Sequence, residues 1–183
     1  MQYIDGAEIS LAIDLDQGAR ISSLQWRDLQ VVLPFRGAAD SWGLFAKVPM
    51  GGHALSWEET GVGRSRLLLP PPYKGAVIEQ SIEILDDAVR WIVEYEPNGV
   101  DEIVDLGLRA WFNRELERGG AAEVVGDQVI RWPGVLQCVV DCDAAMWSND
   151  IQDSDGICLA PDYRDENYLE ALLIFESLDD DLY

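Results

Sequence analysis

The clearest structural signal in the sequence is residues 76–97, which read AVIEQSIEILDDAVRWIVEYEP. Apolar residues alternate with polar ones from Ile78 to Ile84 and again from Val89 to Tyr95. A period of two is typical of a strand that buries one face, and the Asp86-Asp87 pair between the two runs is typical of a tight turn. The segment is therefore predicted to form an antiparallel β-hairpin.

Similar patterns recur along the rest of the chain. Residues 169–177 fit helical spacing as well as alternation, and we interpret them as a strand because strands precede them throughout. Residues 58–75 contain Gly61, Gly63 and three consecutive prolines, which predict a loop rather than core. Further strands are predicted at 9–15, 29–33, 103–112, 128–131, 135–142 and 157–159.

Short strands without a long amphipathic helix predict an all-β protein, built as an antiparallel β-sandwich. The length of 183 residues suits one domain over residues 1–183, so residues 58–75 are expected to be a loop within it and not a linker. The hydrophobic fraction of 48% predicts a folded chain.

Charge is the most pronounced feature of the composition. The sequence has 34 Asp and Glu against 13 Lys and Arg, a formal net charge of −21. Such a surface repels phosphate groups, so neither a nucleic acid nor an anionic membrane is an expected partner. No apolar run approaches the roughly 18 residues of a membrane helix. The acids are spread along the chain, which indicates a solvated surface.

The cysteines predict a reduced protein without a metal centre. Cys138 and Cys142 are four apart in a predicted strand, about 13 Å at ~3.3 Å per residue, whereas a disulfide needs less than about 7 Å. One histidine and no CxxC pair make a structural zinc site improbable. The first residues include no basic stretch of a secretory signal. We therefore expect a cytoplasmic protein without a cofactor.

An acidic stretch at residues 149–156 superficially suggests a calcium loop. Counting back from Gly156 as the sixth loop position puts Ile151 at the first, where an acid is required. A hairpin turn at Asp155-Gly156 is the better interpretation.

Four groups of short motifs follow one another along the chain. They are GARISSL (18–24) with VLP (32–34), WGLFAKVPMGGH (42–53), LGLRAWF (106–112), and WPGVL (132–136) with DA (143–144) and CLAP (158–161). Together they resemble the aldose 1-epimerase, or galactose mutarotase-like, family over most of the chain. The resemblance implies a β-sandwich whose concave sheet holds a sugar ring, and an activity that interconverts α and β anomers with a histidine acid and a glutamate base.

The sequence departs from that pattern at the catalytic positions. The family's histidine falls on Arg109, whose guanidinium stays protonated in proteins, and the glutamate falls on Ala160. The family's sugar-binding arginine falls on His53. Family members are also longer, and the missing parts are expected after residue 53 and between residues 112 and 132. These departures predict a shortened, mutarotase-like pseudoenzyme.

The candidate sugar-binding residues are Arg109, Trp111, His53 and Asp162. In a strand, Arg109 and Trp111 share one side with Asn113, opposite Leu108, Ala110 and Phe112, and suit a sugar through hydrogen bonds and stacking. The alternative is that Trp111 packs beneath a loop and Arg109 pairs with a surface acid.

Residual catalysis would need another acid and base. The candidates are His53 as the acid and Asp162, two residues beyond Ala160, as the base. His53 also fits a plain loop residue beside Gly51-Gly52.

The leading functional hypothesis is therefore a carbohydrate-binding domain without the usual acid and base, which binds a sugar or sugar derivative. The alternatives are a divergent epimerase and a non-catalytic structural or interaction domain. Shortening a sandwich exposes a sheet face or edge, which a second copy would cover, so a homodimer is expected.

Overall fold

The structure is a computed structural model, and most of its described residues lie in β-strands. It describes residues 1–17, 19–32, 44–46, 56–68, 77–96, 106–108, 110–117, 119–126, 128–142, 147–148, 156–159, 162–163 and 168–178. Among these residues the single helical element is a 3-10 turn at Leu15–Gln17, and no helix is long and apolar enough to cross a bilayer.

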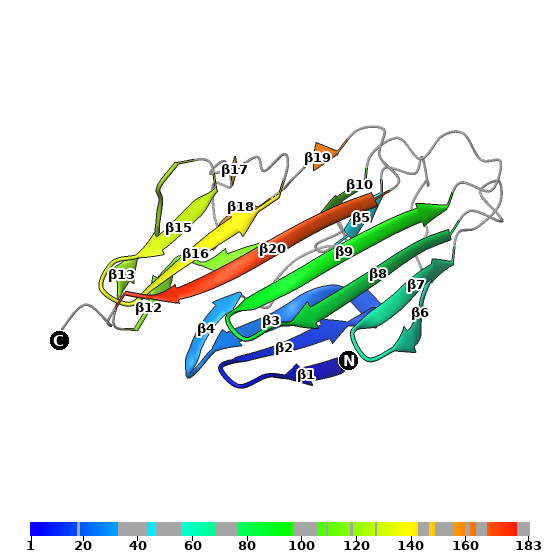
Figure 1. Ribbon diagram of the computed structural model, residues 1–183, viewed down its shortest axis with the longest axis horizontal. Coiled ribbons are helices and arrows are strands. Elements are labelled where there is room, and N and C mark those ends of the chain that lie inside the picture. Colours follow the sequence, from blue (N-terminus) through cyan, green and yellow to red (C-terminus); the bar gives the residue numbers. More distant parts are fainter. Residues whose placement is uncertain are drawn as a thin grey trace.

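One layer of the fold is an eight-stranded antiparallel sheet (Figure 1). Its long central strands lie side by side and bury alternate residues. In order across the sheet the strands are β14 (Glu123–Val124), β15 (Val129–Trp132), β16 (Leu136–Asp141), β20 (Tyr168–Ser177), β9 (Ala88–Glu96), β8 (Val77–Ile84), β7 (Arg64–Leu68) and β6 (Ser56–Gly61).

The second layer is a seven-stranded sheet, and a three-stranded sheet accompanies it. The seven strands are β1 (Gln2–Asp5), β2 (Ile9–Asp14), β3 (Arg20–Trp26), β4 (Leu29–Val32), β11 (Ala110–Asn113), β18 (Gly156–Leu159) and β17 (Trp147–Ser148). The three are β19 (Asp162–Tyr163), β10 (Leu106–Leu108) and β5 (Leu44–Ala46), and β12 (Glu115–Leu116) pairs with β13 (Gly120–Ala121).

A hydrophobic core lies between the two large sheets. Both sheets contribute to a single buried cluster, which is what a β-sandwich requires. The all-β, antiparallel sandwich predicted from the sequence is therefore confirmed. The largest fully buried side chains include Ile9, Leu24 and Phe112 from the seven-stranded sheet, and Ile78, Trp91 and Trp132 from the eight-stranded sheet.

The hairpin predicted at residues 76–97 is formed by β8 and β9. Val77 lies opposite Glu96 and Ile84 opposite Val89, and Leu85 N donates to Ala88 O at 2.7 Å across the turn. Residues 169–177 are confirmed as a strand, because β20 pairs with β16 on one side and β9 on the other. Neighbours on both sides satisfy its backbone groups, a condition that local spacing could not reveal.

The loop predicted at residues 58–75 is wrong over its first part. Residues 56–68 form the hairpin of β6 and β7, and Gly63 lies in its turn with φ +66°. A Cβ at Gly63 would lie 2.2 Å from Ile82 O, so glycine marks a close approach of two strands rather than a long loop. Residues 69–76 lie outside the described residues.

β17 and β18 form the two strands that flank residues 149–156, where the sequence predicts a hairpin turn. β17 and β18 are antiparallel, with Trp147 opposite Leu159. Gly156 already lies in β18, opposite Asn113, so the turn does not lie at Asp155-Gly156. Residues 149–155, including the predicted turn residue Asp155, lie outside the described residues.

Cys138 and Cys142 form no disulfide with each other, as predicted, and both are buried. Complete burial raises the pKa of Cys138 far above its usual value, because the thiolate would lose its hydration. The third cysteine, Cys158, lies on β18.

Candidate functional site

The fold brings the motif segments of the sequence together. β10, from the LGLRAWF motif, lies between β5, from the WGLFAKVPMGGH motif, and β19, which begins just after the CLAP motif. Gly107 is opposite Phe45 on one side and Asp162 on the other. Segments more than 50 residues apart in the sequence thus form adjacent strands.

β11 extends this convergence into the seven-stranded sheet. Phe112 lies opposite Val32 on β4, and Trp111 lies opposite Cys158 on β18. The first motif group, which ends at the VLP segment, therefore borders the third, and the third borders the fourth. Four stretches of chain that carry the family resemblance meet at β10 and β11.

The structure describes the predicted site residues only in part. Trp111 lies on β11 and Asp162 on β19. The β10–β19 and β11–β18 pairings continue one register, with Gly107 opposite Asp162 and Ala110 opposite Leu159. Arg109, Ala160 and His53 lie outside the described residues. The sugar contacts of Arg109 and Trp111 and the pairing of His53 with Asp162 remain predictions.

Asn113, grouped with Arg109 and Trp111 by alternation, has a structural role. Its Nδ2 donates to Gln30 O at 3.0 Å, and its Oδ1 accepts from Glu115 N at 3.2 Å. The amide therefore fixes the end of β11 against β4 and orders the residues that follow.

The WPGVL motif also supports β11. Trp132 is fully buried, and its Nε1 donates to Asn113 O at 2.8 Å. Its ring lies 6.3 Å from the Phe112 ring, tilted by 53°. Gly134, at φ +74°, closes the turn that returns the chain to β16. The motif thus joins the two sheets at the strand that carries Trp111.

A groove of about 660 Å³ lies beside this end of β11, lined in part by Gln30, Asn113 and Glu115. Its single arginine, Arg27, is engaged: Nη2 bonds Glu8 at 3.2 Å and the guanidinium lies 4.2 Å from the Trp26 ring. The remaining charges lining the groove are the carboxylates Asp28, Glu115 and Glu117. The groove therefore favours neutral or cationic ligands.

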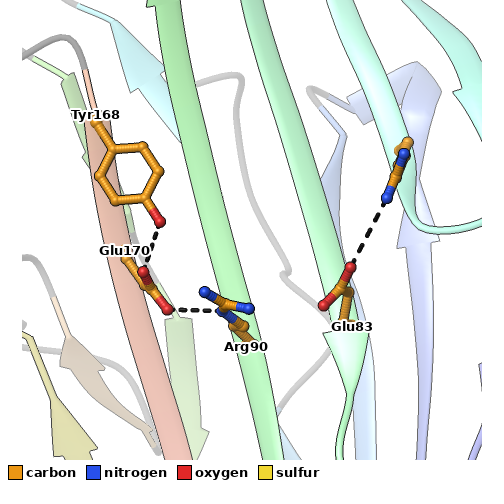
Figure 2. Close-up of polar contacts among 5 residues, drawn as sticks. Glu83, Arg90, Tyr168 and Glu170 are labelled. Atoms are coloured by element: carbon orange, nitrogen blue, oxygen red, sulfur yellow. Dashed lines mark hydrogen bonds and ion pairs between the residues drawn. The ribbon is translucent and has the colours of Figure 1, made fainter.

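The outer face of the eight-stranded sheet carries paired charges that the sequence analysis did not single out. Figure 2 shows Tyr168 and Glu170 of β20 beside Arg90 of β9. Arg90 Nε bonds Glu170 Oε1 at 2.6 Å, and the Tyr168 hydroxyl donates to Glu170 Oε2 at 2.5 Å. The same face holds the Arg66–Glu79 pair and the weaker Arg64–Glu83 pair.

These contacts shift the titration of the groups involved. Hydrogen bonds from Arg90 and then Tyr168 lower the pKa of Glu170. The hydrogen bond to Glu170 raises the pKa of Tyr168, since ionisation would remove the proton that is donated. In the sequence, only the charged residues along β9 and β20 hinted at these ion pairs. Which charges pair across the strands depends on the strand register, which the sequence does not show. Among the described side chains, no group of three acids, histidines or cysteines could hold a metal ion.

The sequence matches no family model, and no curated protein matches it. The fold is similar to the crystal structure of an Escherichia coli K12 protein assigned as an aldose 1-epimerase. The superposition has a TM-score of 0.64 with 13% sequence identity, and covers 97% of this chain and 99% of that chain. The chain therefore has an aldose 1-epimerase-like fold.

Proposed function

We propose that the protein is a mutarotase-like carbohydrate-binding domain that lacks the usual epimerase acid and base. The observation that carries this proposal is the meeting of the motif-bearing strands, with β10 paired to β5 and β19 and β11 paired to β4 and β18. This is the arrangement a sugar site assembled from those four motif groups requires.

The sequence lacks the histidine acid and the glutamate base with which the family catalyses its reaction. Arg109 stands at the histidine position and Ala160 at the glutamate position. An arginine holds its proton at neutral pH and an alanine carries none, so neither can exchange a proton with the sugar. Arg109 and Trp111 instead suit binding, by hydrogen bonds to hydroxyl groups and by stacking on the C–H face of a ring.

The test of binding is calorimetric titration with D-glucose, D-galactose and their methyl glycosides. We expect saturable heat for at least one sugar, and its loss in Trp111→Ala. Trp57→Ala is the matched control, because Trp57 is a half-buried tryptophan on β6, in the other sheet. The absence of heat with every sugar, or equal loss in both variants, would refute the proposal.

The second candidate function is a divergent epimerase that uses His53 as acid and Asp162 as base. Polarimetry of freshly dissolved D-glucose and D-galactose separates the two hypotheses. Binding without catalysis predicts rates equal to those in buffer. A faster rate that is lost in both His53→Gln and Asp162→Asn would favour the enzyme.

We also propose that a homodimer forms through the outer face of the eight-stranded sheet. Half-buried Ile92, Leu172 and Ile174 lie there among charged residues. A net charge of −21 opposes self-association, and the arginines of this face reduce the repulsion there by pairing with its glutamates. Of the arginines with described side chains, Arg64, Arg66, Arg90 and Arg131 lie here, and Arg27 and Arg114 lie elsewhere.

Light scattering at two concentrations tests the dimer, with Leu172→Glu expected to give a monomer. A monomer mass for the unmodified protein at both concentrations would refute it. The buried thiol of Cys138, which forms no disulfide, is in keeping with a reducing compartment, and we propose the cytoplasm.

A further inference from the structure

A groove of about 510 Å³ lies on the outer face of β1, β2 and β3, in the seven-stranded sheet. Ile9, Leu11 and Ile13 of β2 point into the core. The alternate residues Ser10, Ala12 and Asp14 therefore belong to the outer face, where they line the groove. Its lining includes Ser22 and Ser23 of the GARISSL motif, but none of the residues proposed to bind sugar at β10 and β11.

The strand register explains why the surface is hollowed. Ala12 lies between Tyr3 on β1 and Ser23 on β3, and the next row places Ser10 between Asp5 and Gln25. Neighbouring strands are about 4.8 Å apart, so the two outer strands are roughly 10 Å apart. The short side chains of Ser10 and Ala12 on β2 form the floor of the groove, and the longer side chains of β1 and β3 form its two walls.

One wall is apolar and unusually exposed. Tyr3 is 72% exposed and Met1 is 56% exposed, and both line the groove. Exposed large apolar side chains that gather at a hollow commonly mark a binding surface. The ring of Tyr3, on the strand beside Ala12, offers an aromatic platform to the C–H face of a ligand.

The opposite wall is polar and held in place. Gln30 Nε2 donates to Ser23 Oγ at 3.0 Å, to Leu24 O at 3.1 Å and to Val32 O at 2.5 Å. Gln30 Oε1 accepts from Gln25 Nε2 at 3.3 Å. A single glutamine anchored on the backbone thus orients a hydroxyl and an amide that line the groove.

The charges at the groove select among ligands. Asp5 and Asp14 line it, and the one cation among its lining residues is the α-ammonium group of Met1. Among the residues with described side chains, Asp5 makes no ion pair. Carboxylates accept hydrogen bonds from hydroxyl groups and repel anions, so the groove favours neutral polyols over sugar phosphates or uronates.

We propose that this groove is a second carbohydrate site, which takes a neutral pyranose ring. The ring stacks on Tyr3 above Ala12, and its hydroxyl groups bond Asp5, Ser10 and Ser23. This site is separate from the one expected at β10 and β11. Its existence does not depend on whether the proposed function is correct.

The test is an NMR titration of isotope-labelled protein with methyl β-D-glucopyranoside, methyl β-D-galactopyranoside and cellobiose, and with D-glucuronate as the anionic comparison. Methyl glycosides have no free anomeric hydroxyl, so they report binding and not turnover. We expect saturable shifts in the amides of Tyr3, Ala12 and Ser23, with a Kd in the millimolar range for a shallow site, and none with glucuronate.

Two variants fix the location. Tyr3→Ala removes the platform and Ala12→Leu fills the floor, and each should weaken the binding seen at these amides about tenfold or more. Tyr168→Ala is the matched control, because Tyr168 is an exposed tyrosine on the opposite sheet. Circular dichroism melting confirms that the variants fold.

The outcomes separate the two sites. Loss of the β1–β3 shifts in Tyr3→Ala and their persistence in Trp111→Ala supports the second site, whatever happens at β11. Sugar binding that Trp111→Ala abolishes and Tyr3→Ala leaves unchanged supports the proposed function and overturns the second site. Absence of shifts at these amides with all three neutral sugars also overturns it.

Discussion

The outer faces of the two sheets differ although both follow the same alternation. On β7, β8, β9 and β20, long charged side chains face one another across strands and pair, as Arg66 does with Glu79 and Arg90 with Glu170. On β1, β2 and β3, the central strand presents Ser10 and Ala12, and a groove remains.

The difference shows how side-chain length in one strand decides what a sheet face can do. Paired arginines and glutamates cover their own sheet and satisfy their own charges. Short residues between an exposed tyrosine and an anchored glutamine leave hydrogen-bonding groups directed at solvent. Three substitutions test this contrast, in descending order of expected effect.

Gly63→Ala should disturb the packing of both sheets, and with it both outer faces. The new Cβ would lie 2.2 Å from Ile82 O and 2.8 Å from Ile4 Cδ1, and alanine is disfavoured at φ +66°. Because Ile4 is on β1 and Ile82 on β8, the clash pushes the two sheets apart. We expect the free energy of unfolding to fall by about 2–4 kcal/mol, measured by urea denaturation.

Gly126→Ala is the control for Gly63→Ala. Gly126 has φ +81° with no atom within 4 Å of the added Cβ, so this variant carries the backbone cost alone, about 1 kcal/mol. Equal losses in the two variants would show that the contact between the sheets at Gly63 contributes nothing.

Trp132→Phe should weaken the strand that carries the proposed sugar residues, and leave the β1–β3 groove in place. It removes the Nε1 donor to Asn113 O, which leaves that carbonyl without its bond. We expect a loss of about 1–3 kcal/mol in chemical denaturation. Trp57→Phe, at a half-buried position on β6, should cost less. A reversed order would argue against the structural role assigned to the WPGVL motif.

Glu170→Gln should have the smallest effect, confined to the paired face. The pKa of Glu170 is lowered in the folded protein, so its ionised form stabilises the fold above the unfolded carboxyl value of 4.5, and this contribution disappears as pH falls through the lowered pKa. The difference in melting temperature between the two proteins should therefore be present at neutral pH and vanish in acid. The contribution is small because both partners are exposed.

The same variant has a second readout. Without the carboxylate, the pKa of Tyr168 should fall back toward its ordinary value of 10. Absorbance of the phenolate during an alkaline titration measures this shift, and Glu79→Gln on β8 is the matched control. An unchanged tyrosine titration would mean that the bond from Tyr168 to Glu170 is not maintained in solution.

Local pattern predicted much of the fold. The alternation at residues 76–97 and 135–142 correctly gave strands, because a buried face imposes the same period wherever a strand lies. The loop predicted at residues 58–75 is wrong over residues 58–68, since Gly61 and Gly63 resemble loop glycines in sequence. Only the approach of Ile82 O shows that Gly63 serves a tight turn.

Less of the candidate site than of the fold could be predicted from the sequence. The resemblance singled out the motif segments, and the structure adds that β10 pairs with β5 and β19. Alternation placed Asn113 beside Arg109 and Trp111 as a sugar ligand, but the structure engages its amide with Gln30 and Glu115. Hydrogen-bond partners from distant segments carry no local signal.

The class of fold, the acidic composition and the presence of Arg109 and Ala160 in their motifs can all be read from the sequence alone. These are properties of residue type and period, which hold in any arrangement of the strands. The tertiary structure decided which strands are neighbours, which charges pair and where small residues leave a hollow. Register is set by packing of the whole core, and so the groove of Tyr3, Ala12 and Ser23 could emerge only once β1, β2 and β3 were placed side by side.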